Sequence, residues 1–93
     1  MNNSDFTIFG CELFRTCFAC PEQYDVFYEG KQIGYLRLRH GNFTVEYPDV
    51  GGKLVMFASP KGDGIFELDE REHYLTKAVY SLLREHKRNE NSN

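Results

Sequence analysis

The chain has 93 residues, of which 41% are hydrophobic and 27% charged, with a formal net charge of −3. This length allows one small domain, because domains run from about 50 to 250 residues, and the composition is that of a globular protein rather than a disordered one. The acidic balance gives no overall positive field to attract nucleic acid or an anionic membrane, and no run of 18 apolar residues is present to span a bilayer.

The first third of the chain predicts two strands after a loose polar lead-in over residues 1–10. The first strand is expected from Glu12 to Cys20 and is followed by a turn at residues 21–23. The second strand is expected over residues 24–28, which are rich in aromatic and β-branched side chains. Glu29-Gly30-Lys31 then reads as a hairpin turn.

The clearest strand pattern covers residues 32–39. Leu36 and Leu38 fall on one face, while Tyr35, Arg37 and Arg39 fall on the other, because side chains alternate along a strand. Residues 40–42 supply a tight turn of Gly and Asn type. Residues 43–47 alternate again, which is typical of a half-buried strand.

The last half of the chain predicts an apolar strand, a loop and a helix. Residues 53–58 form a continuous apolar run and are expected to be the central strand, whereas residues 65–68 either form a short strand or lead into the helix. The helix is expected from about Glu70 to Lys87, with Asp69 as N-cap and Glu72 completing a capping box. Its apolar stripe at spacings of three and four consists of Leu75, Ala78, Val79, Leu82 and Leu83.

These elements predict an α+β fold for a single domain over residues 1–93. The short connections favour one antiparallel β-meander of about four to five strands with the C-terminal α-helix packed on one face. Residues 89–93 are expected to form a polar tail. The start of the chain lacks the basic and apolar segments of a signal peptide, so we expect a cytoplasmic protein.

The solvent face of the predicted central hairpin carries Tyr35, Arg37 and Arg39. Aromatic and basic side chains on a sheet face are typical of single-stranded nucleic-acid binding, by base stacking and phosphate contacts. The other interpretation is ordinary cross-strand pairing, such as Arg37 with Glu46. The acidic balance of the chain favours the pairing, and the nucleic-acid interpretation stays as the alternative.

Three cysteines, Cys11, Cys17 and Cys20, indicate reduced thiols rather than a disulfide framework, because their number is odd. Cys17 and Cys20 have CxxC spacing, which occurs in zinc sites. A structural zinc site needs four ligands, and only Cys11 and the scattered histidines are present to complete it. The sequence therefore favours Cys17 and Cys20 as packing residues, with zinc binding as the alternative.

Catalytic motifs are missing from the sequence. The chain contains no nucleophile elbow, no HExxH helix and no glycine-rich phosphate loop. The acidic residues between positions 63 and 70 lack the spacing of a calcium loop and are explained by turn and capping chemistry. We therefore expect a protein that is not an enzyme, with no catalytic residue and no cofactor.

Two stretches of the chain carry a family resemblance. Cys20-Pro21-Glu22-Gln23-Tyr24-Asp25-Val26, and the segment from Gly30 to Asp49 that includes Gly34-Tyr35-Leu36-Arg37, resemble short uncharacterised proteins of low-GC Gram-positive bacteria, their prophages and conjugative elements. The resemblance covers roughly residues 20–88. It implies no activity, cofactor or site residue, and it favours a small accessory or interaction protein over a metabolic enzyme.

The primary hypothesis is a small non-enzymatic domain that acts through contacts with an unknown protein partner, with a homodimer as one form of such contact. Its basis is the surplus of aromatic residues, eight Phe and six Tyr, together with the open sheet edges of a meander. The alternatives are a weak single-stranded nucleic-acid-binding module and a zinc-binding domain.

Overall fold

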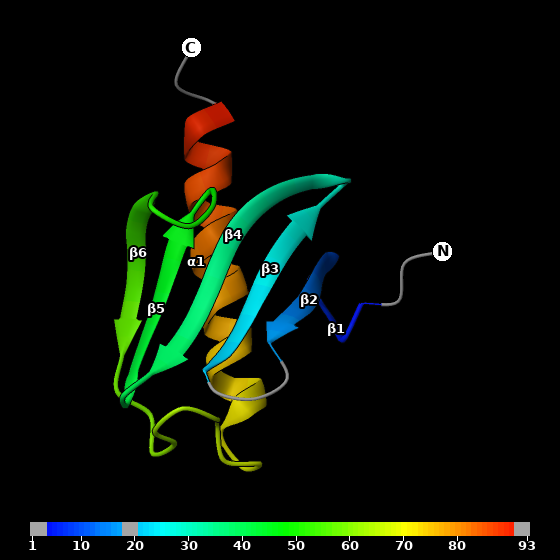
Figure 1. The fold of residues 1–93 in the computed structure, drawn as a ribbon. Helices are drawn as coiled ribbons and strands as arrows, with labels where there is room; N and C mark the ends of the chain where they lie inside the picture. Colours follow the sequence, from blue (N-terminus) through cyan, green and yellow to red (C-terminus); the bar gives the residue numbers. More distant parts are fainter. Residues whose placement is uncertain (1–3, 18–20, 91–93) are drawn as a thin grey trace.

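The computed structural model describes residues 4–17 and 21–90 as one antiparallel sheet with a single helix (Figure 1). The strands and the helix are β1 (Phe6–Ile8), β2 (Cys11–Cys17), β3 (Glu22–Tyr28), β4 (Lys31–Arg39), β5 (Asn42–Tyr47), β6 (Lys53–Ala58) and α1 (Arg71–Glu90). The strand order in the sheet is the order along the chain, β1 to β6. The predicted α+β meander with a C-terminal helix is confirmed, but it has six strands rather than four to five.

Three hairpins of the meander close with the same two-residue turn, in which a non-glycine residue is followed by glycine. The closing pairs are Ile8 with Cys11, Tyr28 with Lys31 and Arg39 with Asn42. In the last of these turns φ is 53° at His40 and 75° at Gly41, the left-handed conformation that matches the twist of the strands. The equivalent turn at residues 9–10 folds the start of the chain back onto β2, so residues 6–8 form a strand within the predicted lead-in.

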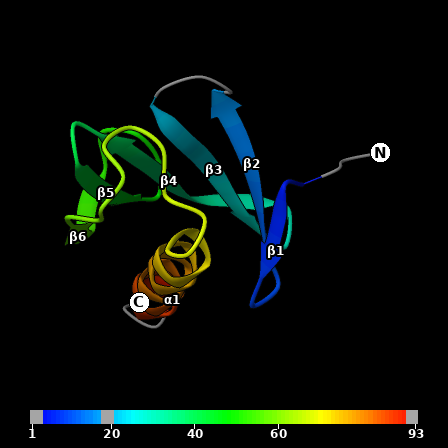
Figure 2. The same ribbon diagram turned by 90° about the horizontal axis from the view of Figure 1, so that it is seen from below.

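The hydrophobic core lies between α1 and one face of the sheet (Figure 2). Alternate residues of β2 to β5 point toward the helix, and they include Leu36 and Leu38, as predicted. The predicted helical stripe also packs here, with Leu75, Ala78, Val79 and Leu82 fully buried and Leu83 partly buried. The opposite face, called the open face below, is covered by no helix or strand within residues 4–17 and 21–90.

Several predicted boundaries differ from the structure. Glu22 and Gln23 belong to β3, so the predicted turn at residues 21–23 is wrong. Residues 65–68 form no strand, and the helix begins at Arg71 and continues through residues 89–90 of the predicted tail. Asp69 is therefore not the N-cap; it lies in the turn before the helix, where its carboxylate accepts a hydrogen bond from Lys61 Nζ at 3.3 Å.

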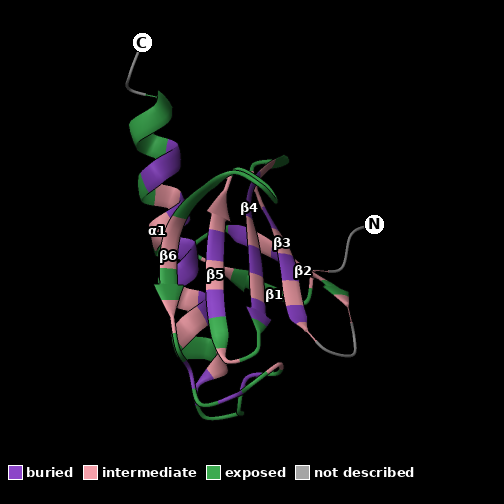
Figure 3. Cartoon of the chain, turned by 60° about the vertical axis from the view of Figure 1, so that its left-hand side comes forward, coloured by how far each residue is buried: buried purple, intermediate pink, exposed green. Residues whose placement is uncertain are grey.

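β6 was expected to be central, but it is an edge strand that pairs only with β5 among the described strands. In a meander the position of a strand in the sheet follows its position in the chain, so the last strand lies at an edge whatever its hydrophobicity. The apolar run consequently leaves two large side chains in solvent, Leu54 at 52% and Phe57 at 57% exposure. Figure 3 shows the contrast with β5, which alternates between buried and part-exposed residues.

Candidate functional site

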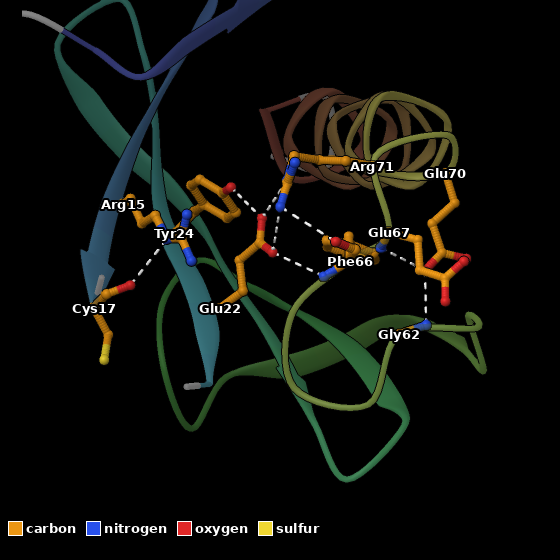
Figure 4. A network of polar contacts seen from close by, with 9 residues as sticks. All are labelled: Arg15, Cys17, Glu22, Tyr24, Gly62, Phe66, Glu67, Glu70 and Arg71. Carbon is orange, nitrogen blue, oxygen red and sulfur yellow. Dashed lines mark hydrogen bonds and ion pairs between the residues drawn. The ribbon is translucent and has the colours of Figure 1, made fainter. Parts of the chain in front are cut away.

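The most buried charged group is the Glu22 carboxylate, which lies beneath the start of α1 (Figure 4). It forms an ion pair with Arg71 Nε at 2.8 Å and accepts hydrogen bonds from the Phe66 backbone N–H at 2.9 Å and from the Tyr24 hydroxyl. Burial alone would raise the pKa of Glu22, but the bonds from Arg71, Tyr24 and Phe66 outweigh it and lower the pKa below the usual 4.5.

A second carboxylate, that of Glu70, organises the loop that precedes α1. It accepts backbone N–H bonds from Lys61 and Gly62 at 2.8 Å each and from Glu67 at 3.0 Å. Glu22 and Glu70 thus have their hydrogen-bonding capacity used by the protein itself. This polar network fixes the loop and the start of the helix to the sheet, which is a structural role.

The three predicted surface residues Tyr35, Arg37 and Arg39 do lie together on the open face of β4. The register places Glu46 opposite Tyr35 and Thr44 opposite Arg37, so Arg37 and Glu46 are diagonal neighbours across the strand pair rather than directly opposite residues. Tyr35 donates its hydroxyl hydrogen to Gln23 Oε1 at 3.0 Å. Burial raises the pKa of this phenol, and the charge of Arg37 opposes that rise.

A shallow hollow of about 310 Å³ lies at one end of the open face. Arg37, Arg39 and His40 line it together with Phe57 from the edge strand. Phe57 lies opposite Thr44, which lies opposite Arg37, so the exposed ring and Arg37 share one cross-strand row, while Arg39 lies opposite Asn42. None of the described residues that line this hollow is acidic.

The proposed metal ligands are only partly visible. Cys17 ends β2 and is half-buried, whereas Cys20 lies outside the described residues, so the zinc hypothesis stays a prediction. Cys11 is fully buried in the core, and burial raises its pKa to about 11. Within residues 4–17 and 21–90, no group of three or more His, Cys, Asp or Glu side chains is arranged to hold a metal ion.

The outer edge of β6 is the longest unpaired strand edge in the described sheet. The other edge strand, β1, has only three residues, which limits pairing with another chain. β6 has six residues, and Lys53 is its only charged residue. A bulge opposite Val45 and Glu46 is the one further feature of β6 that discourages edge pairing.

A groove runs along the helix side of β6, between this strand and α1. It is formed by two hollows of about 220 and 460 Å³ that share Ser81 and Arg84, and the larger hollow is also lined by Phe9 of the turn between β1 and β2. The strand wall includes Val55 and Met56, and the helix wall includes Tyr74. The unpaired backbone of β6 and a hydrophobic floor therefore lie side by side.

The charged side chains of this groove are mostly basic: Lys53, Lys77, Arg84 and Arg88. Among the described residues, the one carboxylate that lines it is Glu85, which is bonded to Lys53 Nζ and Arg88 Nη1 at 3.2 Å each. Lys77 and Arg84 form no ion pair with any described residue, and the Arg84 guanidinium lies 5.8 Å from the centre of the Tyr80 ring. The groove is thus positive in a chain whose net charge is −3.

The sequence predicts open sheet edges but does not assign one to residues 53–58, and it does not predict the basic groove beside that strand. A signal for the groove was present: Lys77, Arg84 and Arg88 lie off the apolar stripe of the helix and follow one another at helical spacing. The edge had no such signal, because a continuous apolar run is equally typical of a central strand.

No protein-family model matches this chain, and neither the curated proteins nor the solved structures searched gave a match. Over residues 4–17 and 21–90, no helix combines the length and the apolar character needed to cross a membrane.

Proposed function

We propose that this chain is a small non-enzymatic protein-binding domain that takes up an extended segment of a partner along β6. The observation that carries the proposal is the unpaired, six-residue apolar edge of β6. In strand addition the main-chain hydrogen bonds supply affinity, and the side-chain positions on the two faces supply specificity. β6 offers both. The backbone of its outer edge is unpaired, exposed apolar side chains lie on its open face, and a groove lies on its helix side.

Exposure and shape support this assignment to β6. Native proteins usually protect sheet edges with charges, proline, bulges or very short strands. β1 follows that pattern, while β6 keeps Leu54 and Phe57 in solvent and relies on one bulge. A six-residue strand offers an edge of about 20 Å, which matches an ordinary β-strand.

Selection from a library of random peptides displayed on phage tests the proposal. We expect the immobilised protein to enrich extended peptides, and we expect the bound peptide to slow amide hydrogen exchange at residues 53–58. Failure to enrich peptides above an unrelated immobilised protein, or protection confined to another strand, would contradict the proposal.

The double variant Leu54→Lys with Phe57→Lys is expected to weaken the selected peptides at least about fivefold, because it removes the apolar side chains that flank the edge and adds charge to it. Both side chains are more than half exposed, so we expect little change in the free energy of unfolding. Leu68→Lys is the matched control, since Leu68 is 88% exposed and lies in the loop before α1. Equal weakening by the control would show a non-specific effect of added charge.

A second candidate function is weak single-stranded nucleic-acid binding on the open face. The observation in its favour is the hollow that brings Phe57 beside Arg37 and Arg39 without an acidic neighbour in its lining. An exposed ring can stack on a base, and the two guanidinium groups can contact phosphates. Against it stand Glu46 and Asp25, which flank Tyr35 on the same face and repel phosphate.

Fluorescence anisotropy with a labelled twelve-nucleotide thymidine strand at low salt tests the second candidate. If the open face binds it, Arg37→Ala with Arg39→Ala should abolish most of the binding and reduce the salt slope by roughly 0.7 per lost phosphate contact. Lys77→Ala with Arg84→Ala, in the groove, is the control and should change little. Absent binding, or binding that survives the first double variant, would end this hypothesis.

A further inference from the structure

The two faces of β6 differ in chemistry. The pairing register places Leu54 opposite Glu46 and Phe57 opposite Thr44, all on the open face. Met56 and Ala58 lie opposite the buried residues Val45 and Phe43 and therefore face the helix side. A strand added beside β6 would have its alternate side chains against these two different surroundings.

On the open face, the neighbours of an added strand are Leu54 and Phe57, whose exposed side chains favour apolar partners across the strand pair. On the helix side, the neighbours are the groove and its basic side chains, and Leu54 and Phe57 also line the two hollows of this groove. Lys77 and Arg84 have no ion-pair partner among the described residues, so they are available to carboxylates. Complementary charge across an interface favours such a partner and speeds its association.

The same charge distribution argues against a second copy of the chain as the occupant. Antiparallel pairing of β6 with β6 about a two-fold axis would place the groove side of one copy next to that of the other. Each copy would then present Lys77 and Arg84 to the same two residues of its partner, and like charges placed opposite each other are unfavourable.

We infer that the segment bound by β6 is an acidic amphipathic strand, with apolar side chains toward Leu54 and Phe57 and carboxylates toward Lys77 and Arg84. This inference rests on the proposed function and names the chemistry of the partner. The two faces of β6 set the pattern of the bound segment. Its apolar and acidic residues alternate over about six positions, which is the length of β6.

Three end-capped nine-residue peptides serve as probes, with valine alternating with Glu, Lys or Gln. At low salt the Glu peptide is expected to bind about tenfold more tightly than the Lys peptide, with the Gln peptide between them, since several modest charge pairs add up. The difference should shrink as salt increases, because exposed charges are screened. Titration calorimetry gives the affinities, and hydrogen exchange at residues 53–58 reports where each peptide binds.

Charge reversal in the groove provides the matched variant. Lys77→Glu with Arg84→Glu is expected to reverse the preference, so that the Lys peptide binds more tightly than the Glu peptide. Both side chains are exposed, and circular dichroism checks that the fold is retained. Arg37→Glu with Arg39→Glu, on the open face, is the control and should keep the preference for the Glu peptide.

The outcomes separate this inference from the proposed function. Equal affinity for the Glu and Lys peptides, with protection at residues 53–58, would overturn the acidic preference and leave strand addition standing. Binding of none of the three would overturn the acidic amphipathic segment, and the selection of random peptides would then decide strand addition by itself. Displacement of the Glu peptide by a thymidine strand would assign the edge to nucleic acid. A dimer of the 10.9 kDa chain that dissociates in Leu54→Lys with Phe57→Lys would assign the edge to a second copy.

Discussion

Replacing Glu22 with alanine is expected to lower the free energy of unfolding by about 3–5 kcal/mol, the usual cost of removing one partner from a buried ion pair. The substitution leaves the Arg71 Nε–H, the Tyr24 hydroxyl and the Phe66 N–H without their acceptor, while Arg71 Nη2 keeps its bond to the Phe66 carbonyl. Single domains are stable by only about 5–15 kcal/mol, so this loss is a large fraction of the total. Urea unfolding followed by circular dichroism measures it.

The matched control is Glu12→Ala, on the neighbouring strand β2. Glu12 is only half-buried and faces Phe27 across the strand pair, so we expect a change within about 0.5 kcal/mol. The pair Glu22→Leu with Arg71→Met should be less destabilised than Glu22→Leu alone, because it also removes the partly buried cation that would otherwise lack its carboxylate. An effect of Glu22→Ala no larger than that of the control would contradict the assigned role.

The same network predicts a dependence of stability on pH. The folded-state pKa of Glu22 is lowered from the usual 4.5, so the folded state holds this proton less tightly than the unfolded chain does. The stabilisation is therefore fully present above about pH 4.5 and is lost as the pH falls through the folded-state pKa. In Glu22→Ala, the free energy of unfolding should fall less steeply as the pH is lowered. The part of the fall that is due to Glu70 should remain, since backbone N–H bonds lower the pKa of Glu70 despite its burial.

Local patterns were sufficient for most of the fold. The alternation of Leu36 and Leu38 with Tyr35, Arg37 and Arg39 identified the two faces of β4, and the helical stripe identified the buried face of α1. The sequence analysis does not predict β1, because its three residues, 6–8, are too few to show an alternating pattern. The turn after them has the same form as those at residues 29–30 and 40–41, which is the signal that could have found it.

The candidate site was harder to predict because it depends on neighbours that are distant in the sequence. Whether an apolar run is central or at an edge is decided by the sheet order, which no window of residues contains. The groove likewise joins Lys53 to residues of α1 about thirty positions later. The sequence pattern places Glu22 in a turn because a buried carboxylate can be predicted only when its hydrogen-bond partners are known. Two of these partners, Phe66 and Arg71, are distant in the sequence, and the third, Tyr24, lies in a strand that was not expected to include Glu22.

Gly34 of β4 lies directly against Leu82 of the helix, and we expect their substitutions to be strongly coupled. A Cβ atom at Gly34 would lie 2.2 Å from Leu82 Cδ1, and Leu82 is fully buried, so its side chain has little room to move. Gly34→Ala is therefore expected to cost about 1–3 kcal/mol by overpacking. Leu82→Ala is expected to cost about 2–5 kcal/mol, because it leaves a cavity.

The double variant Gly34→Ala with Leu82→Ala should lose less stability than the two single losses combined, since the added methyl group partly fills the space that the leucine leaves. An interaction energy of at least about 0.5 kcal/mol from urea unfolding of the four proteins is expected for residues in direct contact. Gly34→Ala with Leu75→Ala is the control, because Leu75 is an equally buried leucine two turns earlier in α1. Additivity in both pairs would mean that the methyl group at position 34 is accommodated by movement of the helix as a whole rather than by the space at Leu82.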